Sequence, residues 1–186
     1  MAFALMDEEY AYVRHLRKGL HALQKIEPGF FSPIETIFFG CPDFRRLWDI
    51  LNHQAHLCGC GEIQNLPVHL PLWHGGVARL DPDSELNIVP GSSEVFWAEA
   101  KAAMDLTGIK QVLALTHFPC GWARERGVKP EALLRSHEIG FKRLQAYAED
   151  RGIIVYPTVH VAYGDLAPGG NKTYLADFDK ALLRAA

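Results

Sequence analysis

The sequence predicts an α/β domain with a central, mainly parallel β-sheet flanked by helices, because short apolar runs alternate with helical segments along the chain. Strands are expected at the apolar runs, residues 35–39, 86–89, 111–116 and 152–156. Helices are expected at residues 7–25, 93–106 and 130–150, with a last short helix at 173–184. In sheets of this kind, ligands usually bind beyond the carboxyl ends of the strands.

The composition is that of one ordinary folded domain. The chain has 186 residues, of which 48% are hydrophobic and 22% are charged, and these values exclude disordered and coiled-coil classes. The net charge is −3 and the 19 lysines and arginines are scattered, so nucleic-acid binding has no electrostatic basis. No apolar run approaches the roughly 18 residues of a membrane span, and no secretion signal is recognisable. We therefore expect a cytoplasmic protein with a single domain over residues 1–186, which binds neither nucleic acid nor membranes.

Two segments lie outside the alternating pattern. Residues 1–30 are expected to form an N-terminal helical arm, whose apolar stripe can pack on its own domain or across a partner subunit. The stripe consists of Met6, Tyr10, Val13, Leu16, Leu20 and Leu23. Residues 52–83 show little periodicity, and we expect them to form a long loop insertion. Compact domains rarely keep so long a loop without a use for it, so a lid or an interface is predicted there.

Two motifs carry the candidate chemistry. Cys41-Pro-Asp43-Phe-Arg45 closes the first apolar run, and His117-Phe-Pro-Cys120 closes a later one. If the two strands are parallel neighbours, two thiolates and an imidazole converge on one point. Two cysteines and one histidine suit Zn²⁺ and leave a fourth position open, as in catalytic zinc sites. Asp43 is able to reach that position or to accept hydrogen bonds from the guanidinium of Arg45.

This ordered pair of motifs resembles the zinc motifs of the β-class carbonic anhydrases, over roughly residues 33 to 166. The resemblance implies that zinc binds to Cys41, His117 and Cys120, and that Asp43 and Arg45 form a gate at the fourth zinc position. It implies reversible hydration of carbon dioxide to bicarbonate by zinc-bound hydroxide. It also implies a homodimer or a higher homo-oligomer in which the N-terminal helix embraces the neighbouring subunit.

The sequence departs from the family in two places. Cys41 and His117 lie 76 positions apart, which is wider than usual in the family, and the excess falls in the 52–83 insertion. Where the family's second strand runs into an Arg-Asn-Ala-Gly-like turn, residues 89–92 read Val-Pro-Gly-Ser. A remodelled entrance leaves two alternatives open: hydrolysis of carbonyl sulfide or carbon disulfide at the same metal, and a catalytically silent zinc-binding relative.

The charge of the ligands predicts the pH dependence of the reaction. Zinc lowers the pKa of a bound water towards neutrality, but two thiolates cancel the formal charge of the ion, so the water is acidified less than in a three-histidine site. Asp43 can compensate by accepting a hydrogen bond from the bound water. Hydration activity is therefore predicted to rise between about pH 7 and about pH 8.5.

Other residues have competing interpretations. Cys120-x5-Arg126 is also the pattern of cysteine phosphatases and arsenate reductases, in which the thiolate attacks and the arginine holds an oxyanion.

Cys58 and Cys60, with His53 and His56, could form a second metal site or a redox pair, although reduced thiols in a loop are the simpler expectation. His137 is expected to be a hydrogen-bonded core residue, with a proton-shuttle role left open. The remaining histidines are expected at the surface or in packing: His15, His21, His69, His74 and His160. Three aromatic residues are candidates for the lining of an apolar pocket or for the core: Phe44, Phe118 and Trp122.

Overall fold

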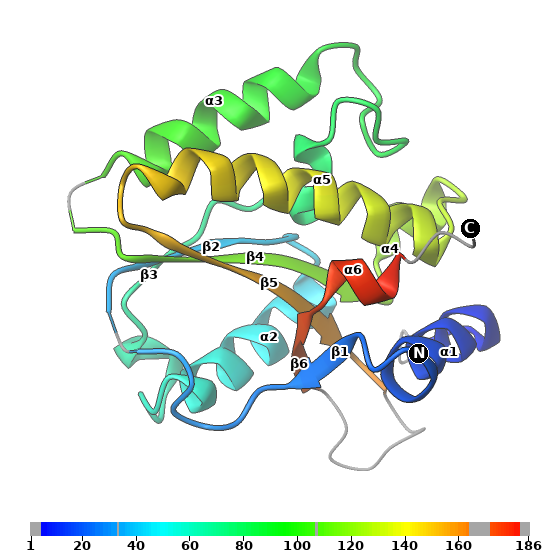
Figure 1. Ribbon diagram of the computed structural model, residues 1–186, viewed down its shortest axis with the longest axis horizontal. Coiled ribbons are helices and arrows are strands. Elements are labelled where there is room, and N and C mark those ends of the chain that lie inside the picture. The colour runs from blue at the N-terminus through cyan, green and yellow to red at the C-terminus, as the bar shows by residue number, and fades with distance from the viewer. Residues whose placement is uncertain (1–4, 33, 107, 164–171, 183–186) are drawn as a thin grey trace.

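A single six-stranded sheet crosses the molecule, with helices on both of its faces (Figure 1). The computed structural model describes residues 5–32, 34–106, 108–163 and 172–182, and only the backbone at positions 44 and 45. The strand order is β1-β6-β5-β4-β2-β3. The strands are β1 (Leu23–Lys25), β2 (Thr36–Phe39), β3 (Val68–His69), β4 (Gln111–Phe118), β5 (Ile154–Val161) and β6 (Lys172–Ala176). Strands β3, β2, β4 and β5 are mutually parallel. Strand β6 pairs antiparallel with β5, and β1 pairs antiparallel with β6. The predicted α/β class is confirmed, with a mixed sheet.

The helices cover the sheet in two layers. They are α1 (Asp7–Arg14), α2 (Phe44–Leu57), α3 (Ser92–Met104), α4 (Gly121–Glu125), α5 (Pro130–Glu149) and α6 (Phe178–Ala181), with short 3-10 turns at Ile63–Asn65 and Gly76–Leu80. Helices α3 and α5 lie on one face of the sheet and α2 lies on the other (Figure 1). Because side chains alternate along β4, Val112 and Ala114 pack in the α3/α5 layer, and Leu113 and Leu115 in the α2 layer. Within the described residues, no helix has the length and apolarity needed to span a bilayer.

The region between α2 and α3 differs from its predicted organisation. Residues 86–89, expected as a strand, form turns and irregular backbone, because Asn87 donates to the carbonyl of Asp81 and accepts from Arg79. Such local side-chain bonds compete with strand pairing. A parallel strand is found instead inside the expected 52–83 insertion. This strand, β3, pairs with β2. That insertion is therefore not one long loop, since it also holds the end of α2 and the 3-10 turn at Gly76–Leu80.

Both ends of the described chain contribute to the sheet. The expected helix at 173–184 begins only at Phe178, where Asp177 caps α6 by accepting from the N–H of Lys180. The residues before it form β6, in which Thr173 and Tyr174 are buried. Residues 183 and 184 of that prediction lie outside the described residues. The prediction of an uninterrupted helix over 7–25 is also wrong, because a π-helical stretch at His15–Gly19 follows α1 and the chain then enters β1.

The N-terminal stripe packs on its own domain. Val13 and Leu16 are completely buried, and Tyr12 lies edge-on to Phe118 with ring centroids 6.3 Å apart. The buried carboxylate of Glu9 pairs with Arg124 of α4. Helix α1 is thus fastened to the helix that begins beside Cys120.

Candidate metal centre

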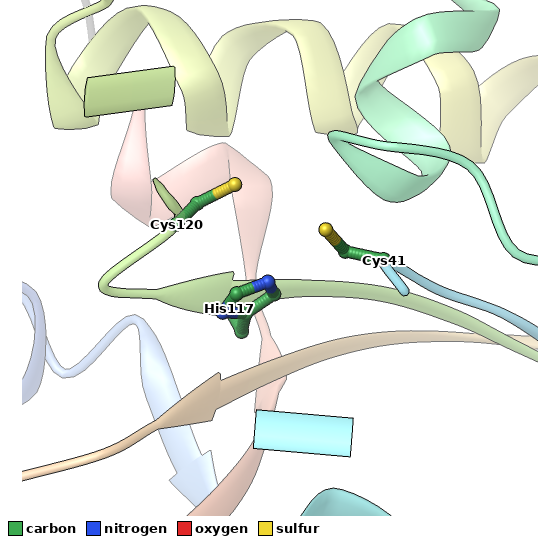
Figure 2. A group of neighbouring side chains, drawn as sticks. All are labelled: Cys41, His117 and Cys120. Atoms are coloured by element: carbon green, nitrogen blue, oxygen red, sulfur yellow. The ribbon is translucent and has the colours of Figure 1, made fainter. Parts of the chain in front are cut away.

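The three predicted ligands meet at the carboxyl edge of the parallel strands (Figure 2). Cys41 follows β2, His117 lies near the end of β4, and Cys120 immediately precedes α4. Strands β2 and β4 are parallel neighbours, so the residues that follow them lie at the same edge of the sheet. The ligand atoms of the three residues all lie within 4.8 Å of one another, and each residue is at most 2% exposed. The predicted convergence is confirmed.

The three residues fit a metal ion. Both ring nitrogens of His117 are buried and have no hydrogen-bond partner among the described residues, which is costly unless an ion or another group satisfies them. Two sulfurs bound tetrahedrally to one zinc lie about 3.8 Å apart, given bonds of about 2.3 Å, so only small movements would close the site. Thiolate and imidazole donors suit zinc and other borderline or soft ions.

The two neighbouring thiols shift each other's pKa values in opposite directions. The hydrogen bond from Cys120 is the largest cause that lowers the pKa of Cys41 to about 4, with smaller contributions from His117 and from the backbone N–H of Gly75. That N–H donates to Sγ of Cys41 at 3.5 Å. The bond to Cys41, together with burial, raises the pKa of Cys120. A bound cation would displace the proton of a thiol that it binds, because a coordinating thiol is deprotonated outright.

A turn at Trp73–Gly76 supports Cys41 and was not identified from the sequence. The N–H of Trp73 donates to the carbonyl of Gly40, and the N–H of Gly76 to the carbonyl of Trp73. Gly75 and Gly76 have φ values of +93° and +59°, which favour glycine. A Cβ at Gly76 would lie 2.6 Å from the carbonyl oxygen of Leu115. The adjacent glycines were the available signal, and they lie within the segment interpreted as an insertion.

A cavity of about 210 Å³ lies beside Cys41. Its lining consists of Cys41, Pro42, Asp43, His74, Gly121, Trp122 and Glu125. The pocket role is confirmed for Trp122, whereas Phe118 is a core residue with 1% exposure. His74 is exposed, as expected, and its ring lies 5.3 Å from that of Trp122, so it also contributes to the lining of the cavity.

Asp43 lies beside the predicted ligands, at the start of α2. It is buried and lines the cavity together with Cys41, and its carbonyl accepts from the N–H of Leu47 in the first turn of the helix. The backbone of Arg45 belongs to the same turn, but its side chain lies outside the described part of the structure. The Asp43/Arg45 gate therefore stays a prediction.

The second cysteine pair does not join a metal cluster. Among the residues that the structure describes, the only group of three or more suitable ligands is Cys41, His117 and Cys120. Burial and the neighbouring Cys60 raise the pKa of Cys58 to about 11, which makes it a poor nucleophile. His53 instead accepts a hydrogen bond from the N–H of Thr173 and so ties α2 to β6. These contacts support the simpler expectation of reduced thiols.

The arrangement around Arg126 disfavours a phosphatase. The residues between Cys120 and Arg126 form α4 instead of a loop around an anion, and Cys120 is 1% exposed. The guanidinium of Arg126 stacks on Trp122, 4.6 Å from the ring centroid. An oxyanion cradle needs an accessible thiolate with the arginine directed towards the same anion, and neither condition is met.

His137 lies in the core, as expected. It is fully buried on α5, its Nε2 donates to the carbonyl of Ala114 at 3.0 Å, and its ring packs edge-on to Phe178. Burial lowers the pKa of His137 to about 4. The side chain is therefore neutral in the folded protein at physiological pH.

This buried histidine predicts acid sensitivity. An unfolded chain protonates histidine near pH 6.5, whereas folded His137 resists protonation down to about pH 4. The unfolded state therefore binds more protons in this window, and the free energy of unfolding should fall by about 3 kcal/mol as the pH drops through it. Urea titrations of wild type and His137→Gln at several pH values test this expectation. The variant should be less stable at pH 7 but should lose less stability on acidification, and equal slopes would refute the assignment.

Comparison of the chain with family models, with curated proteins and with solved structures finds no match in any of the three. The function has to be inferred from the geometry and chemistry of the metal centre and from the sequence motifs that form it.

Proposed function

We propose that the protein is a zinc enzyme that hydrates carbon dioxide reversibly to bicarbonate, with zinc held by Cys41, His117 and Cys120. The observation that carries this proposal is the convergence of two thiols and a buried, unpartnered imidazole, with Cys41 and Asp43 in the lining of an adjoining cavity. The order of the two motifs, which resembles that of the β-class carbonic anhydrases, supports the same reaction.

Each part of the site has a role in this reaction. Zinc, when bound, supplies Lewis acidity that lowers the pKa of a coordinated water towards neutrality. The N–H of Gly75 withdraws charge from the Cys41 thiolate and so limits the loss of acidity that two thiolates cause. Asp43 would accept a hydrogen bond from such a water and orient it, and, as the resemblance implies, pairing with Arg45 would control whether the carboxylate binds the metal itself. The flat ring of Trp122 gives a nonpolar gas an apolar surface on its path.

We propose further that the enzyme acts in the cytoplasm as a homodimer joined through its N-terminal arm. Val13 and Leu16 are buried within the chain, but Met6 and Tyr10 of the same stripe are 49% and 37% exposed. An apolar edge of this kind on α1 suits contact with a second copy.

Stopped-flow carbon dioxide hydration tests the proposed activity. Zinc-loaded protein should accelerate hydration, and the rate should rise between about pH 7 and about pH 8.5, as the coordinated water loses its proton. Asp43→Ala should keep its zinc and lose about tenfold or more in rate, because the orienting carboxylate is gone. A wild-type rate equal to the uncatalysed rate would contradict the proposal. Hydrolysis of carbon disulfide without carbon dioxide hydration would favour the alternative substrate, and zinc binding without either activity would favour a silent relative.

A further inference from the structure

The three metal ligands are almost completely enclosed. Cys41, His117 and Cys120 are 2%, 1% and 1% exposed, so a molecule can reach them only through an opening in the surrounding residues. The cavity of about 210 Å³ is such an opening, because Cys41 is part of its lining. At about 30 Å³ per molecule it corresponds to about seven waters. A cavity of about 150 Å³ already binds benzene, so this space holds molecules up to about the size of one aromatic ring, whereas a four-ring pyrenyl group exceeds it.

Trp122 is held rigidly at the side of this entrance. Its indole Nε1 donates to the carbonyl of Leu86 at 3.4 Å, its ring lies 5.3 Å from that of His74, and the guanidinium of Arg126 stacks on it at 4.6 Å. Three contacts from different parts of the chain restrain one side chain. The ring therefore forms one side of the cavity, and moving it aside for a large ligand would cost these contacts.

We propose that Trp122 is a specificity-determining residue that limits the size of the molecules able to reach Cys41, so that triatomic gases enter and polycyclic groups are excluded. The proposal deepens the proposed function and rests on it for the identity of the substrate, whereas the access that Trp122 controls is a property of the protein with or without metal. Removing the indole is expected to open the path to Cys41 for polycyclic aromatic groups. It should change little for molecules that already fit.

Alkylation of Cys41 measures this access without any enzymatic assay. The full chain is stripped of metal with a chelator and treated with iodoacetamide, which is small, or with N-(1-pyrenyl)maleimide, which is large, and peptide mapping by mass spectrometry follows Cys41. Trp122→Ala should label about tenfold faster than wild type with the pyrenyl reagent, and less than twofold faster with iodoacetamide. Trp122→Phe should fall between wild type and Trp122→Ala. Trp48→Ala is the matched control, because Trp48 is 64% exposed on α2 and does not line the cavity.

The outcomes are distinguishable. Equal pyrenyl labelling of Cys41 in wild type and in both Trp122 variants would overturn the proposal. If Trp122→Ala opens the fold, labelling of the buried Cys58 will also rise, and Trp122→Phe then decides the question. Zinc content and hydration rates of the same proteins test the proposed function separately, so a protein that binds no zinc can still show, or fail to show, the size dependence.

Discussion

A Cys120→Ser variant is expected to lose its metal. Wild type should hold one zinc per chain, and the variant should bind zinc about 100-fold more weakly or not at all. Loss of an outer-shell partner typically costs about 10- to 100-fold in metal affinity, and the loss of a ligand should cost at least as much. Serine is a poor replacement because its hydroxyl does not ionise as a thiol does. Elemental analysis of the purified protein and competition with a chromophoric chelator measure the change, and hydration activity should disappear with the metal.

Cys58→Ser is the matched control for this result. Cys58 is also a buried thiol, with 5% exposure, but it belongs to the core beneath α2 and not to the metal centre. The control variant should keep one zinc per chain, whatever small stability it loses. A Cys120→Ser protein with full zinc content, or a Cys58→Ser protein without zinc, would place the metal elsewhere and contradict the assignment.

The convergence of the ligands was predictable because it depends on a general property of parallel sheets. Each motif follows an apolar run, and parallel neighbours such as β2 and β4 end at the same edge. The two long helices α3 and α5 were predictable within a residue or two for a similar reason, since buried helix faces produce periodic sequences. Local patterns therefore sufficed for the centre of the fold and for the proximity of Cys41, His117 and Cys120.

The edges of the sheet were not predictable in this way. Strand β3 is very short and lies among turns, so its few residues carry no periodic signal. Strand β6 directly precedes a short helix, and the two together resemble one helical segment. Residues 86–89 are apolar enough for a strand, but the bonds of Asn87 to Arg79 and Asp81 decide their conformation. Such contacts depend on the tertiary structure, which overrides local propensity.

The supporting turn at Gly75–Gly76 shows why part of the site escapes sequence reasoning. The N–H of Gly75 reaches Cys41 across 34 positions of the chain, and Gly76 packs against the carbonyl of Leu115 in β4. In the sequence these are two glycines in a loop, whereas in the structure they allow the backbone of this turn to approach Cys41 and β4 closely. A pair of glycines predicts a turn, but it does not indicate which distant residue the turn contacts.

A Gly76→Ala substitution should therefore damage both stability and the metal centre. The left-handed backbone at φ +59° costs an alanine about 1 to 2 kcal/mol. The new Cβ would lie 2.6 Å from the carbonyl oxygen of Leu115, and 3.4 and 3.5 Å from backbone atoms of Gly40 and Cys41. Overpacking of this kind costs about 1 to 3 kcal/mol more. Urea denaturation should show a total loss of about 2 to 5 kcal/mol in the free energy of unfolding, with weaker zinc binding because Cys41 is displaced.

Gly127→Ala separates the two causes. Gly127 also has a left-handed backbone, at φ +66°, but a Cβ there would meet no atom within 4 Å. Its alanine variant should lose only the backbone cost of about 1 to 2 kcal/mol and should bind zinc as wild type does. If Gly76→Ala costs no more than Gly127→Ala and keeps its zinc, the close approach at Leu115 does not position Cys41. A larger loss of unfolding free energy at Gly76, accompanied by weaker zinc binding, would mean that this turn positions Cys41 for metal binding.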